Sequence, residues 1–229
     1  CPFELVPSRR LCGIRRRPVH GLQVCPHGEN RIRLHALRAR ALAVIADRPG
    51  ALACLDAAQN AHDMSAGPDE NPRQADDVDP VWEPGIFGFT AAKRSTYAGT
   101  TLLTLDHPHL LVRAVEESTR ALQAYQHVSE VERSGGDILA AHLDLASAHH
   151  RTDDLDAAHT HLRVVTQAPA DRRTASITAR LLRLVRDLAD TPAGCSALGR
   201  QMLESSRAVL SDRPRSLRPY AHEEHLHDG

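Results

Sequence analysis

Histidine and cysteine are the side chains whose number and spacing first suggest chemistry in this chain. Its 229 residues include 15 His and five Cys. His149 and His150 lie in one helix of a predicted helical hairpin, and His159 and His161 lie in the other, so imidazoles from both helices can meet. A zinc site is normally completed by further thiolate, imidazole or carboxylate ligands, and this pattern supplies no such set. We therefore interpret these His as surface or packing residues and expect no metal.

Other reactive patterns are incomplete. Cys12, Cys25 and His27 have a spacing that matches no standard zinc motif. The sequence contains no Gly-rich phosphate loop, no Gly-x-Ser-x-Gly elbow and no His-Glu-x-x-His helix. We predict that the protein is not an enzyme and uses no cofactor. Five irregularly spaced Cys indicate no disulfide framework, and we expect a cytoplasmic protein.

Charge is distributed unevenly along the chain. Residues 1–40 contain nine Arg against two Glu, whereas residues 66–90 contain six acidic residues against one Arg. The segment 1–28 is rich in Pro and Gly, so it offers no rigid element that could read bases. We expect no specific DNA binding by this chain alone. The sequence has no run of 18 apolar residues, so we also expect no membrane partner.

Apolar residues at helical spacing define the elements that must position any site. Hydrophobic residues make up 41% of the chain but aromatic residues only 3%, so Ala and Leu must form the core, which favours an all-α fold. Helices are predicted over 29–46, 51–64, 91–105, 108–126, 137–151, 153–167, 171–189 and 193–210. We divide the chain into an irregular basic leader (1–28), a repeat domain with an acidic loop at 66–90 (29–190), and a C-terminal helix with a flexible tail (191–229).

Small residues recur where consecutive helices should cross. Ala39 and Ala51 are twelve residues apart, as are Ala146 and Ala158, and Gly99 lies in the middle of a predicted helix. Such residues let two helices approach closely. Each pair of small residues brackets two helices joined by a turn, and this arrangement is close to the paired helices of the 34-residue tetratricopeptide repeat. It predicts a tetratricopeptide-like helical-hairpin solenoid, with three hairpins plus capping helices.

Several details of this solenoid follow from single residues. We expect Trp82, Phe87 and Phe89 to dock the end of the acidic loop onto the repeat, because aromatic side chains need cover. Asp137 is the predicted N-cap of the helix over 137–151. Two further residues, Cys54 and Cys195, lie in helical patterns and are interpreted as small core residues.

Four segments resemble a known family. The first segment, 85–105, contains a predicted helix with the sequence Tyr-Ala-Gly, and the second, 133–146, ends in Asp-Leu-Ala. The third, 154–158, is Asp-Leu-Asp-Ala-Ala, and the fourth, 169–174, is Pro-Ala-Asp-Arg-Arg-Thr. Over about residues 29–190 the chain resembles the C-terminal tetratricopeptide-like repeat region of actinobacterial XRE-family helix-turn-helix transcriptional regulators. In that family a short DNA-binding domain precedes the repeats, which sense a ligand or partner, or dimerise. The leader (1–28) is too short to be that domain, so we expect the DNA-binding domain to be absent from this chain.

The resemblance also indicates where a ligand would bind, because the first helix of each hairpin lines the concave face of such repeats. With Ala36 and Leu143, the predicted groove residues are Arg33, Arg40, Lys93, Thr96, Thr100, Ser147 and His150. A basic, hydroxyl-rich groove favours an acidic peptide or a small anionic ligand. We expect a sensory module of a transcriptional regulator, with homodimerisation as a further implied role. The alternative is a free-standing scaffold that mediates protein–protein interaction.

Overall fold

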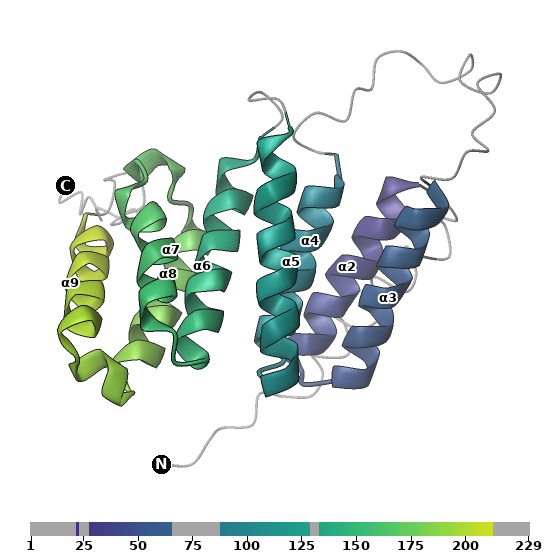
Figure 1. Cartoon of the computed structure of the whole chain (residues 1–229). Coiled ribbons are helices and arrows are strands. Elements are labelled where there is room, and N and C mark those ends of the chain that lie inside the picture. Colours follow the sequence, from purple (N-terminus) through teal and green to yellow (C-terminus); the bar gives the residue numbers. More distant parts are fainter. Residues whose placement is uncertain (1–21, 23–27, 66–87, 129–132, 213–229) are drawn as a thin grey trace, which may run out of the picture.

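Helices form all the regular structure in the part of the chain that the structure describes. The computed structural model describes residue 22 and residues 28–65, 88–128 and 133–212 (Figure 1). The leader, the acidic loop and the tail therefore lie almost entirely outside the described residues. In order, the α-helices and 3-10 helices are α2 (Glu29–Val44), α3 (Arg48–Ser65), α4 (Ala91–Thr104), α5 (Pro108–Gln126), α6 (Gly135–Arg151), α7 (Leu155–Gln167), η3 (Ala170–Arg172), α8 (Ala175–Ala189), η4 (Pro192–Cys195) and α9 (Ala197–Ser211). None of the helices within these ranges has the length and apolarity needed to cross a membrane.

The helix ends follow from local side chains. Thr90 caps α4 by accepting a hydrogen bond from the Lys93 N–H at 3.4 Å, which satisfies a donor that has no partner within the helix. The predicted cap of α6 was wrong. Ser134, not Asp137, is its N-cap, and the Ser134 hydroxyl accepts a hydrogen bond from the Asp137 N–H at 3.3 Å. The helix therefore begins two residues earlier than the sequence pattern indicated.

The helices are arranged in pairs. The even-numbered helices α2, α4, α6 and α8 pack on one another in that order, and we call them the inner layer. Each is covered by the helix that follows it, so α3, α5, α7 and α9 lie outside this layer (Figure 1). The sequence predicted the first three pairs. The last two α-helices, predicted as capping helices, pack on α6 and α7 and on each other, and we call α8 and α9 the fourth pair.

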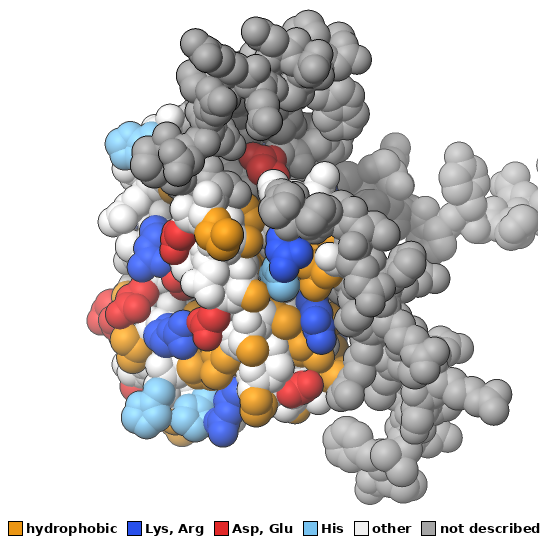
Figure 2. Space-filling view, turned by 90° about the vertical axis from the view of Figure 1, so that its right-hand side faces the viewer, with side chains coloured by type: hydrophobic (Ala, Val, Ile, Leu, Met, Phe, Trp, Pro, Cys, Tyr) orange, Lys and Arg blue, Asp and Glu red, His pale blue; other side chains and the backbone are white. Residues whose placement is uncertain are grey.

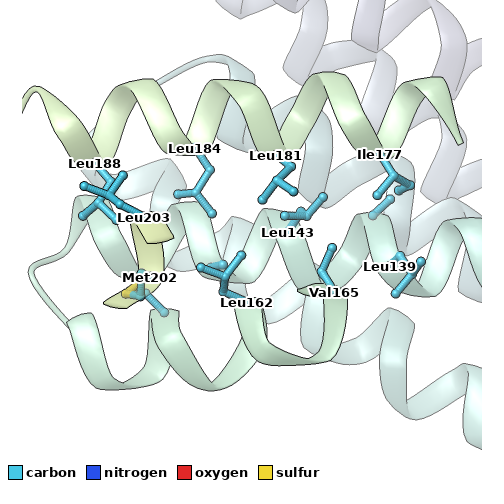
Figure 3. Packing of buried hydrophobic residues seen from close by; sticks show 13 residues of the cluster. Leu139, Leu143, Leu162, Val165, Ile177, Leu181, Leu184, Leu188, Met202 and Leu203 are labelled. Carbon is cyan, nitrogen blue, oxygen red and sulfur yellow. The ribbon is translucent and has the colours of Figure 1, made fainter. Parts of the chain in front are cut away.

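The core is built from aliphatic side chains, as the composition requires. One cluster joins α6, α7, α8 and α9 through the Leu, Ile, Val and Met side chains drawn in Figure 3. A second cluster joins α2, α3, α4 and α5, and it includes the buried Cys54. Cys195 does not belong to the core; it is exposed at the end of η4, because a 3-10 helix precedes α9.

Close helix crossings occur where the sequence predicted them. Ala39, Ala51, Ala146 and Ala158 each have 0% of their surface exposed. A Cβ atom at Gly99 would lie 2.3 Å from the Ser118 Oγ of α5, well inside van der Waals contact. Helices can approach this closely only when the crossing residues are small.

The end of the acidic loop packs on the first pair. Phe89 is 5% exposed and lies in a cluster with Ile32 and Ala58. Its ring contacts Tyr97 edge-on, with centroids 5.2 Å apart, and its N–H donates to the Glu29 carboxylate at 3.0 Å. The predicted docking is therefore confirmed for Phe89. Trp82 and Phe87 lie outside the described residues.

Surface charge of both signs is mixed over the first pair. Figure 2 views the molecule from the side on which α2 and α3 lie, and basic, acidic and hydrophobic side chains alternate over the described part of that face. Such mixing creates no field of one sign. The described part of this face therefore offers no patch of one charge that would attract a ligand.

His35, on α2, gives a testable pH dependence. Burial, and then the charges of Arg31 and Arg38, lower the pKa of this imidazole below its ordinary value of 6.5. The folded state keeps His35 neutral where the unfolded chain takes up a proton, so stability falls as pH decreases through the unfolded-state pKa. Lowering the pH from about 7.5 to 5.5 should therefore decrease the free energy of unfolding less in His35→Gln than in the parent. Urea titration at each pH would measure this. The exposed residue His127 provides the control substitution His127→Gln, and a parental pH slope for His35→Gln would contradict the prediction.

Candidate ligand-binding site

A cavity of about 270 Å³ opens on the inner layer and touches all four of its helices. We call it the inner-layer cavity. It is lined by Arg40 from α2, Thr96, Tyr97 and Thr100 from α4, Gly136, Asp137 and Ala140 from α6, and Thr174, Ser176, Ile177 and Arg180 at the start of and within α8. One concave space therefore collects side chains from residues far apart in sequence.

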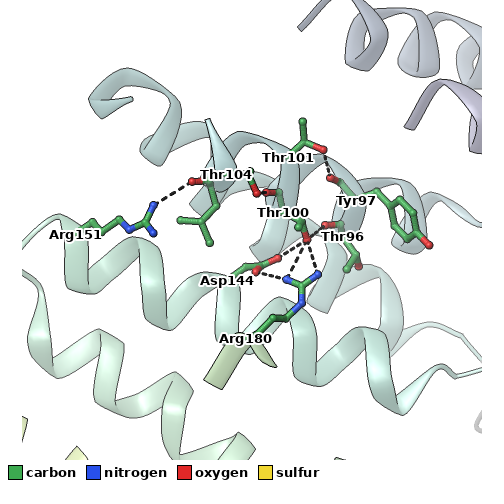
Figure 4. Close-up of polar contacts among 9 residues, drawn as sticks. Thr96, Tyr97, Thr100, Thr101, Thr104, Asp144, Arg151 and Arg180 are labelled. Carbon is green, nitrogen blue, oxygen red and sulfur yellow. Dashed lines mark hydrogen bonds and ion pairs between the residues drawn. The ribbon is translucent and has the colours of Figure 1, made fainter. Parts of the chain in front are cut away.

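A buried polar network lies beside this cavity. Arg180 forms an ion pair with Asp144 across 2.5 Å, and the Thr100 hydroxyl donates to the other Asp144 oxygen at 2.6 Å (Figure 4). Both terminal nitrogens of Arg180 also lie 3.3 Å from the Thr100 Oγ, which accepts from them. Three inner-layer helices, α4, α6 and α8, are thus joined through three side chains.

Burial dominates the electrostatics of this network. Only 4% of the Asp144 side chain is exposed, and this burial raises the pKa of its carboxyl above the usual value. The Arg180 guanidinium, then the Thr100 hydroxyl and last the charge of Arg40 act in the opposite direction, because they stabilise the charged carboxylate. Arg180 is therefore committed to Asp144, and the pair adds little net charge to the cavity.

Arg40 is the cationic group that remains for a ligand. Its guanidinium lies over the Tyr97 ring, 4.7 Å from the centroid, in a cation–π contact. Within the described ranges, no ion pair includes Arg40, although its charge acts on the nearby Asp144 carboxyl and lowers the pKa of that group. An aromatic surface that fixes a guanidinium beside a cavity is well suited to hold an anion.

The rim of the cavity combines partial positive charge with one carboxylate. The first turns of α6 and α8 both reach it, through Gly136 and Ser176 among others, and the N-terminal ends of helices carry partial positive charge. The acidic residue at this rim, Asp137, accepts a hydrogen bond from the Tyr125 hydroxyl at 3.2 Å. Burial and the nearby Asp137 raise the pKa of Tyr125, so this hydroxyl keeps its proton and remains a donor.

The structure places three of the predicted groove residues together. Arg40, Thr96 and Thr100 line the inner-layer cavity, although the Thr96 hydroxyl donates to the Ala92 carbonyl at 2.9 Å. Arg33 is exposed and does not line it. Lys93 also lies outside the lining, and its Nζ donates to the Gly88 carbonyl at 2.8 Å.

The predicted groove face of α6 and the placement of Ala36 were wrong. Ser147 does not line the cavity, and His150 is only 6% exposed and lines a different cavity that also contains Asp106. Ala36 and Leu143 are buried in hydrophobic clusters. The side of α6 that contacts the network carries Asp144, one residue after Leu143, because one position turns a helix by about 100°.

Sequence reasoning missed Tyr97, Asp144 and Arg180 as site residues. Asp144 carried a usable signal, since it is a carboxylate between two Leu in an otherwise apolar stretch, and buried charges are normally paired. Arg180 carried none, because its helix was interpreted as a cap. No family model, curated protein or solved structure matches the chain. The geometry of the cavity is therefore the main guide to function.

Proposed function

We propose that this chain is the ligand-binding sensory module of a cytoplasmic transcriptional regulator, with its DNA-binding domain outside the chain. The proposal includes a tetratricopeptide-like solenoid, in which the inner layer forms the concave face. The resemblance to XRE-family repeat regions supports the regulatory role. The observation that carries the binding role is the guanidinium of Arg40, fixed on Tyr97 beside the inner-layer cavity and included in none of the ion pairs of the described residues.

The ligand that fits this site best is a small anionic molecule. Drug-sized ligands occupy pockets of about 300–1,000 Å³, and the cavity volume of about 270 Å³ is just below that range. A carboxylate or phosphate would pair with Arg40, while Tyr97, Ala140 and Ile177 supply apolar contacts for the rest of the molecule. The helix ends at the rim would add further stabilisation of the negative charge.

Occupancy of this cavity can alter the shape of the array. Arg40 lies on α2 and Ser176 on α8, so a ligand that contacts both would favour one spacing of the first and fourth pairs. A ligand shifts a conformational equilibrium only by its difference in affinity for the two states. A site assembled from four helices provides such a difference when those helices move relative to one another.

The alternative function is a free-standing scaffold that holds a protein partner. In that case the same cavity would take an acidic side chain of a peptide, and the peptide would continue along the inner layer. The two functions are distinguished by the coding sequence upstream of residue 1. An in-frame helix-turn-helix domain supports the regulator, and a start codon beside residue 1 supports the scaffold.

Replacing Arg40 tests the binding site itself. We expect Arg40→Met to weaken the binding of small carboxylates or phosphates at least about tenfold, because a hydrogen bond to a charged group contributes about 1.5–3 kcal/mol. A thermal-shift screen of such anions, followed by calorimetry on the best one, would measure this. Arg33→Met is the matched control, since Arg33 is an exposed Arg of the same helix outside the cavity. Equal losses in both variants would contradict the assignment.

The regulatory role requires a separate experiment. The full-length protein encoded at this locus should bind a DNA segment from its own neighbourhood, and the anion found by the screen should change that affinity. Arg40→Met in the full-length protein should bind the DNA but lose the response. A protein whose DNA binding is unaffected by any ligand of the cavity would exclude a sensory module.

A further inference from the structure

Two imidazoles face each other across the third helix pair. The Nδ1 atom of His142 on α6 lies 3.1 Å from the Nδ1 atom of His161 on α7. Their ring centroids are 5.3 Å apart, and the rings are tilted by 41°. Both side chains are partly buried, so solvent still reaches the pair. We infer that His142 and His161 together bind a divalent transition-metal ion across the α6–α7 hairpin.

The distance between the two nitrogens suits a shared metal ion. A metal–nitrogen bond to His is about 2.0–2.1 Å long. Two such nitrogens are therefore about 2.9 Å apart in square coordination and about 3.3–3.4 Å apart in tetrahedral coordination. The observed 3.1 Å lies between these values. The two Nδ1 atoms now point toward each other, so an ion can bind both once the rings turn and their lone pairs converge on it.

The protonation of the pair is compatible with metal binding. Imidazole binds metal in its neutral form, which prevails at pH 7 even at the ordinary pKa of His, about 6.5. In the metal-free pair, one Nδ1 must carry a hydrogen and donate it to the other. When the metal binds, that hydrogen moves through solvent to the Nε2 of the same ring. The pair therefore releases no net proton.

The neighbouring side chains hold one of the rings in place. His149 stacks on His161, with centroids 5.7 Å apart and an interplanar angle of 11°. The Nδ1 of His149 is directed to Asp154, whose carboxylate oxygen is 3.4 Å away. Within the described ranges, no three His, Cys, Asp or Glu side chains are grouped so that they could hold a metal. The described part of the chain therefore supplies two ligands, and we infer that water completes the coordination sphere.

The choice of metal follows from this ligand set. Two imidazoles and water favour Cu(II) and Ni(II), which accept tetragonal coordination, and the affinity should be highest for Cu(II) in the order of divalent ions. Zn(II) should bind less tightly than Cu(II). This expectation concerns a solvent-accessible site on the α6–α7 hairpin and is independent of the inner-layer cavity.

The test uses the full chain with His222, His225 and His227 replaced by Gln, so that the tail does not bind the probe. Calorimetry with Ni(II) and with Cu(II) alone should show one site. His142→Ala and His161→Ala should each lower its affinity at least about tenfold and remove the rise in melting temperature caused by metal. His159→Ala is the matched control on α7 and should bind as the parent does.

Spectroscopy distinguishes a chelate from a simple contact. The electron paramagnetic resonance spectrum of the Cu(II) complex should show coupling to two imidazole nitrogens, and to one in each single variant. His161→Asn replaces the ring with a smaller polar group if the Ala variant fails to fold, and circular dichroism checks each variant. Absence of binding, or equal binding by the parent and both single variants, would overturn the inference.

Discussion

Replacing Arg180 by Ala is expected to lower the free energy of unfolding by about 3–5 kcal/mol, the range found when one partner of a buried ion pair is removed. Arg180 and Asp144 have 17% and 4% of their side chains exposed, so the Asp144 carboxylate would remain buried without its cation. The Thr100 hydroxyl alone cannot replace the guanidinium. Chemical denaturation followed by circular dichroism would measure the change.

A control and a rescue make this result specific. Arg183→Ala removes an exposed Arg from the same helix and should alter the unfolding free energy by less than about 0.5 kcal/mol. The double variant Asp144→Leu with Arg180→Met removes both charges together and should recover most of the loss, because hydrophobic replacement of a buried pair is often neutral. An Arg180→Ala variant as stable as Arg183→Ala would show that the pair contributes little.

Gly99→Leu is the second substitution with a large expected effect. A Cβ at this position would lie 2.3 Å from the Ser118 Oγ, 3.3 Å from the Ser118 N and 3.4 Å from the Ala114 carbonyl oxygen. Extra atoms in a packed contact cost about 1–3 kcal/mol. A Leu side chain places further carbon atoms beyond Cβ at the same crossing. The gain in helix propensity, about 1 kcal/mol, offsets only part of this cost. The melting temperature should therefore fall by several degrees.

Two companion variants locate the cause at the α4–α5 crossing. Gly135→Ala replaces a helical glycine that has no neighbouring atom within 4 Å of the added Cβ, so it should leave the melting temperature unchanged or raise it. The Gly99→Ala variant places its Cβ only 2.3 Å from the Ser118 Oγ. Adding Ser118→Ala removes that hydroxyl and should restore part of the stability that Gly99→Ala loses. A Gly99→Leu protein that melts with the parent would mean that α5 does not approach α4 at this residue.

Much of the fold could be predicted because helix periodicity is a local property. Apolar spacing and turn residues located the eight α-helices that the described residues contain, and small residues such as Ala39 and Ala146 identified the crossings. The cap of α6 was harder to choose, since Ser134 and Asp137 are both good capping residues in the same short segment. The contacts between α8 and α9 were harder to predict, because they depend on which surface of α6 remains uncovered.

The candidate site was only partly predictable. Arg40, Thr96 and Thr100 are polar residues at helical spacing, and they do line one cavity. Pairing of Asp144 with Arg180 depends on the rotation of α6 and on the position of α8, neither of which is encoded within a single helix. An error of one residue in α6 was enough to favour Leu143 over Asp144.

The contact between Arg180 and Thr100 has a consequence for how the array unfolds. In an array of helix pairs, each pair usually contacts only the pairs next to it, so a terminal pair can unfold while the rest stays folded. Here a side chain of the fourth pair reaches the second pair, across a separation of 80 residues. Opening α8 breaks hydrogen bonds on α4 and α6 at the same time, which couples the last pair to the middle of the molecule. The chain should therefore lose its structure as one cooperative unit, with similar hydrogen-exchange protection along α4, α6 and α8.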